Sequence, residues 1–209
     1  MVNIKKLLSL DDMYEIEKEI ESLEAVTSGE IVPVIARKSS SYKTVEAVDA
    51  FVLSYIFMFI FYAVHKSLTP TSIVVLTIVA MLVIMLMSQF KFLKRIFVPK
   101  ILMKHKVHSA AMMSFYRHSV YNTKERTGIL IYISLMERMV VVIGDEGIHS
   151  KVGDEAWSSV ISTIVDGIKK KKLTHGIVNG VESCRTLLMK HFPASSDNKN
   201  ELSNRVIYE

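Results

Sequence analysis

The sequence predicts a mixed α/β fold in which helices flank a small mixed sheet and a two-helix transmembrane hairpin interrupts the domain. Three observations support this fold class. Residues 50–124 contain no Asp or Glu, and two long apolar runs lie within them. Two β-rich segments follow this region closely spaced, and a third precedes it. Amphipathic patterns of helical period occur on both sides. Neither flank alone holds a sufficient core, so the two flanks are expected to fold together.

The second apolar run, residues 71–90, predicts a membrane-spanning helix. Its 20 residues carry no charge, and as a helix they cover about 30 Å, the thickness of a bilayer core. The first run, residues 47–64, is weaker because Asp49 lies near its start, so a re-entrant or interfacial helix is the alternative there. Residues 65–70 join the two runs, which is enough to connect antiparallel neighbours.

Basic residues predict the orientation of this hairpin. The flanks are rich in them, whereas the connecting loop holds only Lys66: the flanking residues are Arg37, Lys38, Lys43, Lys91, Lys94, Arg95, Lys100, Lys104 and Lys106. By the positive-inside rule we expect a multi-pass protein of the inner or cell membrane with its N- and C-termini in the cytoplasm. The first apolar patch is too short for a signal-peptide core, so both runs are expected in the mature protein.

The expected partners follow from the same charges. The lipid bilayer is the first, and the basic stretch after Phe90 either contacts anionic headgroups or only fixes the topology. The net charge of +5 is modest. No zinc finger, RNP-like aromatic box or helix-turn-helix pattern is present, so no nucleic-acid partner is expected.

The segment before the hairpin predicts one helix and one strand. Ser9 and Asp12 have the spacing of a capping box, and apolar residues then recur at helical steps for about fifteen residues. Gly29 is expected to end this helix as a C-cap. Residues 30–36 form a short strand, and Pro33 within it predicts an edge strand or a bulge.

The segment after the hairpin holds a helix over 107–120 and the clearest β signal. Residues 128–135 and 139–143 are rich in β-branched residues, and a three-residue turn between them predicts an antiparallel hairpin. Helices are expected over 157–168 and 176–191, separated by a lysine run and ended by Pro193.

The expected organisation therefore has four parts. Residues 1–46 form the first part of the domain, and residues 47–90 form the membrane hairpin. Residues 91–193 hold the basic juxtamembrane segment and the main part of the domain. Residues 194–209 are polar, and we expect a mobile tail there.

Several of these passages resemble the TPM domain family. The central passage runs from Arg126 through the strand, the charged turn and Arg138, and then continues through 140–148, VVVIGDEGI. Thr27–Ile35, Trp157 and the ending 184–193 agree with it. The resemblance covers roughly residues 10–36 and 105–193 and is closest to the membrane-hairpin subgroup of bacteria. It implies a TPM-like α/β sandwich with a small sheet between helices.

The resemblance also implies functions, which differ among family members. Some are linked to acid phosphatase activity and to divalent cations in acidic loops, and others act as assembly or accessory factors, including in photosystem repair. In bacteria such proteins are often encoded beside LemA-type membrane proteins. Here the usual G-Y-G-type loop reads Gly144-Asp145-Glu146-Gly147, the anchor is internal and no signal peptide is found. In these three features the sequence departs from the more common secreted pattern of the family.

The best candidate ligands for a cation are Asp145 and Glu146, which follow a strand and are flanked by glycines. With Asp154 or Glu155 one short loop away, these carboxylates would suit Ca²⁺ or Mg²⁺, which prefer oxygen ligands. The alternative is a solvated turn, since DEG is ordinary turn sequence.

Other reactive residue types have structural interpretations beside functional ones. Arg126 and Arg138 could hold an anion, and surface pairing with carboxylates such as Glu137 is the alternative. His105 and His108 lack a third ligand at metal-site spacing, and His118 shares their helix, so a basic helix is the simpler reading. Cys184, the single cysteine, lies at an apolar helix position and is expected to be a buried thiol.

The sequence thus favours a membrane-anchored TPM-like protein that acts as an interaction or accessory module, with a protein partner such as a LemA-type membrane protein or another TPM protein. The alternative is a divalent-cation-dependent, acid-phosphatase-like hydrolase. A cation-bound water and a polarised phosphoryl oxygen would be its chemistry. Transport is a weaker third possibility, because two helices without an intramembrane charge pair offer no pathway.

Overall fold

The computed structural model describes residues 8–64, 69–87, 98–194 and 199–209. Two compact units are distinguished: residues 1–39 with 105–209 form the domain, and residues 40–104 contain the helical hairpin. Most of the expected connecting loop (65–68), the end of the second apolar run (88–90) and the basic residues of 91–97 lie outside the described residues.

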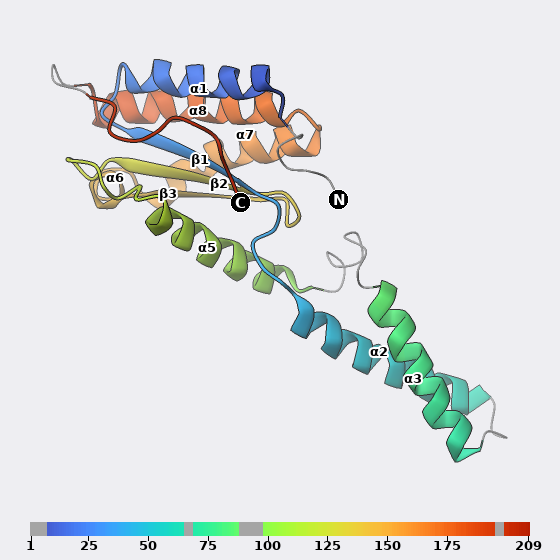
Figure 1. The fold of residues 1–209 in the computed structure, drawn as a ribbon. Helices are drawn as coiled ribbons and strands as arrows, with labels where there is room; N and C mark the ends of the chain where they lie inside the picture. The colour runs from blue at the N-terminus through green and yellow to red at the C-terminus, as the bar shows by residue number, and fades with distance from the viewer. Residues whose placement is uncertain (1–7, 65–68, 88–97, 195–198) are drawn as a thin grey trace. The chain divides into compact units, whose positions relative to one another are not determined.

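A four-stranded sheet organises the domain, with strand order β3-β2-β1-β4 (Figure 1). β1 (Glu30–Ala36) pairs in parallel with β2 (Gly128–Ser134), which pairs antiparallel with β3 (Met139–Gly144). β4 (Ile207–Tyr208) pairs in parallel with β1. The predicted hairpin of two strands is confirmed, and strands from both sides of the insertion share one sheet.

Helices cover both faces of this sheet. α1 (Leu10–Glu24), α7 (Ser158–Lys169) and α8 (Leu173–His191) lie on one face, and α5 (Lys100–Arg117) lies on the other (Figure 1). The four-residue α6 (Glu146–His149) and the 3₁₀ turn Asp154–Trp157 connect β3 to α7. This arrangement confirms the mixed α/β fold with helices flanking a small sheet.

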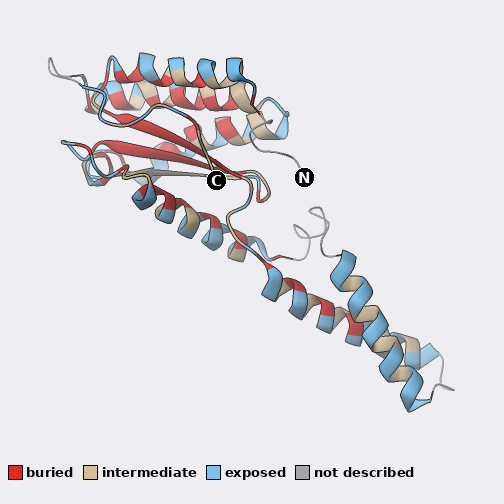
Figure 2. Cartoon of the chain, viewed as in Figure 1, coloured by how far each residue is buried: buried red, intermediate tan, exposed pale blue. Residues whose placement is uncertain are grey.

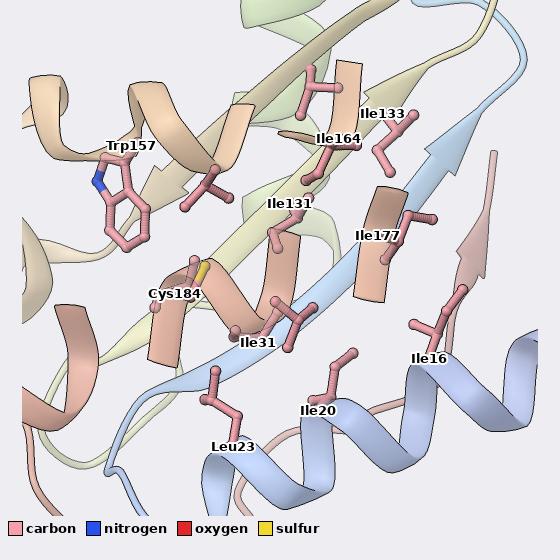
Figure 3. Close-up of a cluster of buried hydrophobic side chains, with 14 of the residues drawn as sticks. Ile16, Ile20, Leu23, Ile31, Ile131, Ile133, Trp157, Ile164, Ile177 and Cys184 are labelled. Atoms are coloured by element: carbon pink, nitrogen blue, oxygen red, sulfur yellow. The ribbon is translucent and has the colours of Figure 1, made fainter. Parts of the chain in front are cut away.

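The larger core lies between the sheet and three helices. Alternate residues of β2 point into it, and helix residues at three- and four-residue steps meet them (Figure 3). The fully buried members include Ile16, Ile20, Leu23, Ile31, Ile131, Ile133, Ile164, Ile177 and Cys184. Full burial of one such aliphatic side chain contributes about 1.5–3 kcal/mol.

The second core is smaller, because only α5 covers that face of the sheet. Its buried residues come from β1, β2 and α5, together with Val120 just after α5. Val107, Ala111 and Phe115 of α5 face the strands, while Ile101 and Tyr116 on the same helix are exposed. One helix therefore protects the strand residues on this face.

The predicted capping box at the start of α1 is confirmed. The Asp12 backbone N–H donates to the Ser9 hydroxyl at 3.1 Å, and the Ser9 N–H donates to Asp12 Oδ2 at 2.8 Å. The predicted Gly29 C-cap is wrong. The cap residue is Ala25, no described glycine has a positive φ, and the Thr27 hydroxyl donates to the Leu23 carbonyl instead.

Pro33 does not mark an edge strand, since β1 lies between β2 and β4. The Glu30 N–H donates to the Thr127 carbonyl on the β2 side, so strand alternation turns the Pro33 nitrogen to the opposite side. On that side β4 reaches only Val34 and Ile35. No ladder bond is lost at Pro33, because the strand opposite it is missing there.

α8 begins at Leu173, three residues before the predicted start. α7 and α8 pack closely where glycines of the two helices meet. A Cβ at Gly167 would lie 2.4 Å from the Gly176 Cα, and one at Gly180 would lie 2.4 Å from the Ile164 side chain. Gly176 and Gly180 therefore lie inside α8, where the absence of a side chain lets α7 approach closely, and they do not mark a helix boundary.

The predicted mobile tail is wrong for its last part. Residues 195–198 lie outside the described residues, but the segment 199–209 contains β4, which pairs with β1. Val206 is buried in the larger core, and Ile207 packs beside the smaller one. Side chains of this segment therefore alternate between the two faces of the sheet, as those of a strand do.

The second unit consists of α2 (Lys43–Val64) and α3 (Pro70–Met87), which pack against each other. Both helices are long and apolar enough to cross a membrane, with mean hydropathy 2.1 and 2.5. α2 starts four residues before the predicted run of residues 47–64, and Asp49 lies in its second turn. Most of the side chains of both helices are exposed (Figure 2).

Candidate functional site

The loop after β3 holds the residues that the sequence singled out, and the structure pairs one of them with an arginine. Arg126 Nη2 donates to Asp145 Oδ1 at 3.0 Å, and Arg126 Nε lies 2.8 Å from Oδ2 as the ion-pair contact. The Asp145 side chain is 5% exposed. Oδ1 also accepts the Glu146 N–H at 2.8 Å, which caps α6. A charge-assisted hydrogen bond of this kind is stronger than one between neutral groups.

The backbone around Arg126 is shaped for this contact. Arg126 has a φ of 57°, a left-handed conformation that non-glycine residues rarely adopt. Its carbonyl accepts the Gly147 N–H at 3.0 Å, and a Cβ at Gly147 would lie 2.4 Å from the Glu125 carbonyl oxygen. The residues before β2 and those after β3 are thus fastened together at one end of the sheet.

The predicted cation ligands are not gathered around a common point in the described residues. Glu146 and Glu155 are exposed, and the Asp154 side chain lies outside the described part of the chain. Within the residues that the structure describes, no three Asp, Glu, His or Cys side chains lie close enough to hold a metal ion. The Ca²⁺ or Mg²⁺ site at Asp145, Glu146 and Asp154 stays a prediction, and Arg126 already occupies the Asp145 carboxylate.

The other candidates take structural positions. Glu137 is buried and accepts hydrogen bonds from the Ser39 N–H and the Ser134 hydroxyl, which fixes the β2–β3 turn. Arg138 occupies the left-handed position of that turn, with φ 53°. Burial raises the pKa of the Cys184 thiol to about 12, so the thiol is protonated and unreactive.

Of the three candidate histidines, one lies beside a carboxylate. His118 Nε2 lies 3.0 Å from Glu209 Oε1, whereas His105 and His108 are exposed on α5. Glu209 also accepts hydrogen bonds from Arg117 at 2.8 Å and the Ser114 hydroxyl at 3.2 Å. Three residues at the end of α5 therefore hold one side chain of the last segment.

Two buried carboxylates escaped the sequence analysis. Glu24 is 6% exposed and Glu30 is 3% exposed, and both lie under residues 202–204. Glu24 Oε1 accepts the Ile31 N–H at 2.9 Å, and Oε2 accepts the Asn204 amide at 2.6 Å. Burial raises the pKa of Glu24 to about 8 and also raises the pKa of Glu30.

A signal for one of these residues was present in the sequence. Glu24 follows Ile16 and Ile20 at four-residue steps, so it shares the buried face of α1. The run Val206-Ile207-Tyr208 has high β propensity and was the signal for β4, although its polar neighbours concealed it. Glu30 carried no such signal, because strand burial on both faces cannot be read from seven residues.

An open pocket of about 670 Å³ lies where α1 begins beside the α7–α8 connection. Asp12, Lys171, Lys172 and His175 contribute to its wall, together with apolar residues. A hydrogen bond from Ser9 holds the pKa of Asp12 below its usual range. Both signs of charge line this pocket, so its wall favours no single class of ligand.

Comparison with protein-family models identifies the domain. Residues 93–187 match the model of the TPM domain, a span that holds α5, β2, β3 and the helices through most of α8. The chain carries a TPM domain. α1, β1 and β4 lie outside the matched span, yet β1 supplies a central strand of the same sheet. In this chain the TPM fold is therefore completed by segments from both ends.

A solved structure supports the same fold. The NMR structure of the BA42 protein from the psychrophilic bacterium Bizionia argentinensis is similar to this chain, with a TM-score of 0.63 and 22% sequence identity over all of both chains. At this identity the likeness concerns the fold alone. The search of curated proteins found no match.

Proposed function

We propose that this chain is a membrane-anchored TPM-domain protein, whose α2–α3 hairpin crosses the bilayer and whose domain binds a protein partner in the cytoplasm. The observation that carries the proposal is the outward-facing apolar surface of the hairpin. The large apolar side chains that are at least 46% exposed are Val48, Phe51, Val52, Tyr55, Ile56, Phe57, Phe59, Ile60, Tyr62 and Val64 on α2, and Val74, Val75, Ile78, Val79, Leu82, Val83, Met85, Leu86 and Met87 on α3.

A surface of this kind is costly in water. Each Å² of apolar surface removed from water contributes about 25 cal/mol, and soluble monomers rarely expose contiguous apolar patches above a few hundred Å². No residue of α3 is buried, and the buried residues of α2 are Glu46, Ala50 and Ser54. Hydrocarbon chains would cover these side chains, and a helical backbone meets the requirement that its polar groups bond internally.

The cytoplasmic orientation rests on charge. Basic side chains lie on both sides of the hairpin, including Lys43 at the start of α2 and Lys100, Lys104 and Lys106 on α5. Short segments rich in Lys and Arg stay on the cytoplasmic side. The partner class implied by the family, a LemA-type membrane protein or another TPM protein, remains a prediction for cross-linking in native membranes to test.

Cysteine accessibility tests insertion and orientation together. In a Cys184→Ala background, single cysteines are placed at Thr69 at the start of α3 and at exposed Ser159 on α7. A membrane-impermeant maleimide added to intact cells should label the Thr69→Cys protein and leave the Ser159→Cys protein unlabelled. Inverted vesicles should give the opposite pattern. Labelling of both positions from one side, or release of the protein by alkaline carbonate, would overturn the proposal.

A further inference from the structure

Residues 199–209 occupy one edge of the sheet through a small number of separable contacts. The Glu209 N–H donates to the Ile35 carbonyl at 3.1 Å, and the Arg37 N–H donates to the Glu209 carbonyl at 3.0 Å. β4 itself has two residues, shorter than most strands. Hydrogen bonds to Glu24 and Glu30 hold the residues just before it. The segment is thus a strand added to a sheet that is otherwise complete.

Side-chain sites define what this edge accepts. Val206 and Tyr208 pack on the larger core, and Ile207 packs on the smaller core. The Glu209 carboxylate then enters a cationic and hydroxyl-bearing site made by Ser114, Arg117 and His118. In order, the edge takes an aliphatic, an aliphatic, an aromatic and an acidic side chain, in parallel register with β1.

Release of the segment is helped by the groups it covers. Glu24 and Glu30 are removed from water by residues 202–204, and that burial disfavours their charged forms. When the segment leaves, both carboxylates become hydrated, which offsets part of the apolar burial lost at Val206. On the same side of β1, Pro33 has no N–H to leave unpaired.

We propose that the side of β1 opposite β2 is a binding groove for an extended segment of a partner protein, and that residues 199–209 occupy it in the unbound domain. The partner segment adds as a parallel strand and carries two aliphatic residues, an aromatic residue and a carboxylate in that order. Strand addition to a sheet edge is a common mode of peptide recognition, with backbone bonds for affinity and side-chain pockets for specificity. This groove deepens the proposed function by locating the partner surface, and so it rests on the interaction role.

Its test uses a fluorescein-labelled peptide with the sequence of residues 199–209 and the full-length protein in detergent. The double variant Ile207→Asp/Glu209→Arg keeps the chain intact but places charges where the segment meets the smaller core and Arg117. We expect this variant to bind the peptide at least tenfold more tightly than the wild-type protein, whose own segment competes.

Charge reversal supplies the matched control. A peptide carrying Arg in place of Glu209 should bind the released variant at least tenfold more weakly, because it meets Arg117 and His118. Adding Arg117→Glu to the protein should reverse the preference, so that the Arg peptide binds more tightly than the peptide of wild-type sequence. Competition from the protein's own segment affects both peptides equally and does not change this preference. Arg117 is 55% exposed, so this substitution leaves the cores intact even if the double variant proves unstable.

Three results would overturn the proposal. One is a folded released variant, shown by an unchanged melting profile of the domain, that binds neither peptide. Another is equal affinity for both peptides. The third is a wild-type protein whose mass doubles with concentration and reverts on addition of peptide, which would make the occupant a second copy. Peptide binding in detergent does not depend on membrane insertion, so its failure is separable from failure of the cysteine-accessibility test.

Discussion

The domain and the hairpin contain similar apolar side chains, but those of the domain core are buried and most of those on the hairpin are exposed. In the domain, Ile129, Ile131 and Ile133 on β2 are fully buried. On the hairpin, Phe59 is 67% exposed and Leu86 is 70% exposed. Residue composition alone does not distinguish these regions, because both are rich in aliphatic residues. What distinguishes the helices of the two regions is the presence of charged and polar positions at regular spacing, which gives a domain helix one side for water and one for a core. The central strands of the domain are buried on both faces because helices cover the sheet on each side.

The helices of the two regions are stabilised by different surroundings. Domain helices such as α1 have a buried stripe and are stabilised by packing against a sheet. The hairpin helices have no such stripe against protein along most of their length, so their stability depends on the surrounding solvent. Substitutions that change the same residue type in the two regions should therefore give different results.

The largest expected difference comes from removing an isoleucine. Ile131→Ala should lower the unfolding free energy of the domain by about 2–5 kcal/mol, because it leaves a cavity between β2 and the helices. Ile78→Ala on α3 should leave domain unfolding unchanged, since that side chain is 54% exposed. Chemical denaturation in detergent, followed by the fluorescence of buried Trp157, measures both. Equal losses would remove the distinction between the regions.

Introducing a charge should affect the hairpin more than the domain surface. Val79→Arg places a cation near the middle of α3 and should disfavour insertion by about 3 kcal/mol. Tyr116→Arg on α5, at a position 60% exposed, is the matched control and should have no effect. The measured quantity is the fraction of protein in carbonate-washed membranes. An unchanged fraction for Val79→Arg would argue against a transmembrane α3.

The domain contains its own exception, since Glu24 is a carboxylate on a buried face. Its pKa in the folded protein is about 8, above the ordinary value of 4.5, because of burial. A raised pKa means that the folded state binds the proton more tightly, so the stabilising contribution is complete below pH 4.5 and is lost as the pH rises through about 8. Wild-type stability should fall across that interval.

Glu24→Gln should remove most of this pH dependence and stabilise the domain at pH 8 by an amount on the order of 2 kcal/mol. A residual slope of the same sign should remain from Glu30, whose pKa is also raised. Glu15→Gln, at an exposed position on the same helix, should keep the wild-type profile. Melting temperatures from pH 5 to pH 9 give the comparison, and parallel curves for wild type and Glu24→Gln would refute the assignment.

The smallest effect concerns the predicted cation site. Asp145→Asn weakens the contact with half-exposed Arg126 and should cost about 1 kcal/mol, whereas exposed Glu146→Gln should change stability by less than about 0.5 kcal/mol. Since the Arg126 guanidinium already pairs with the Asp145 carboxylate, millimolar Ca²⁺ or Mg²⁺ should leave the wild-type melting temperature unchanged. A rise that Asp145→Asn abolishes would establish the cation site and reopen the hydrolase alternative.

Local patterns predicted most of the fold. The Ser9–Asp12 capping box, β1 and the β2–β3 hairpin depend on neighbouring residues, and all are confirmed. Errors arose where a distant segment decided the outcome. Pro33 is tolerated because β4, more than 170 residues later, is short. Gly176 lies inside α8 and not at its start, and its lack of a side chain serves the close packing against Gly167 of α7.

The candidate site shows the same limit. The sequence placed Asp145 correctly after a strand, but its partner Arg126 reaches it across the sheet end through a left-handed backbone that no local pattern announces. The pairing of β4 with β1 was missed because a polar stretch resembles a mobile tail until a sheet edge is known to lie beside it. Both features depend on pairing between segments far apart in the chain.

Lipid contact of the hairpin is tested most directly by fluorescence quenching. Trp157 is the single tryptophan and is buried in the domain, so the wild-type protein is the reference for a fluorophore away from lipid. A second protein carries Trp157→Phe and Leu82→Trp, which moves the fluorophore to an exposed position on α3. In vesicles of brominated phospholipid, we predict strong quenching of the tryptophan at position 82 and none of Trp157. Equal, weak quenching of both would contradict a hairpin surrounded by lipid.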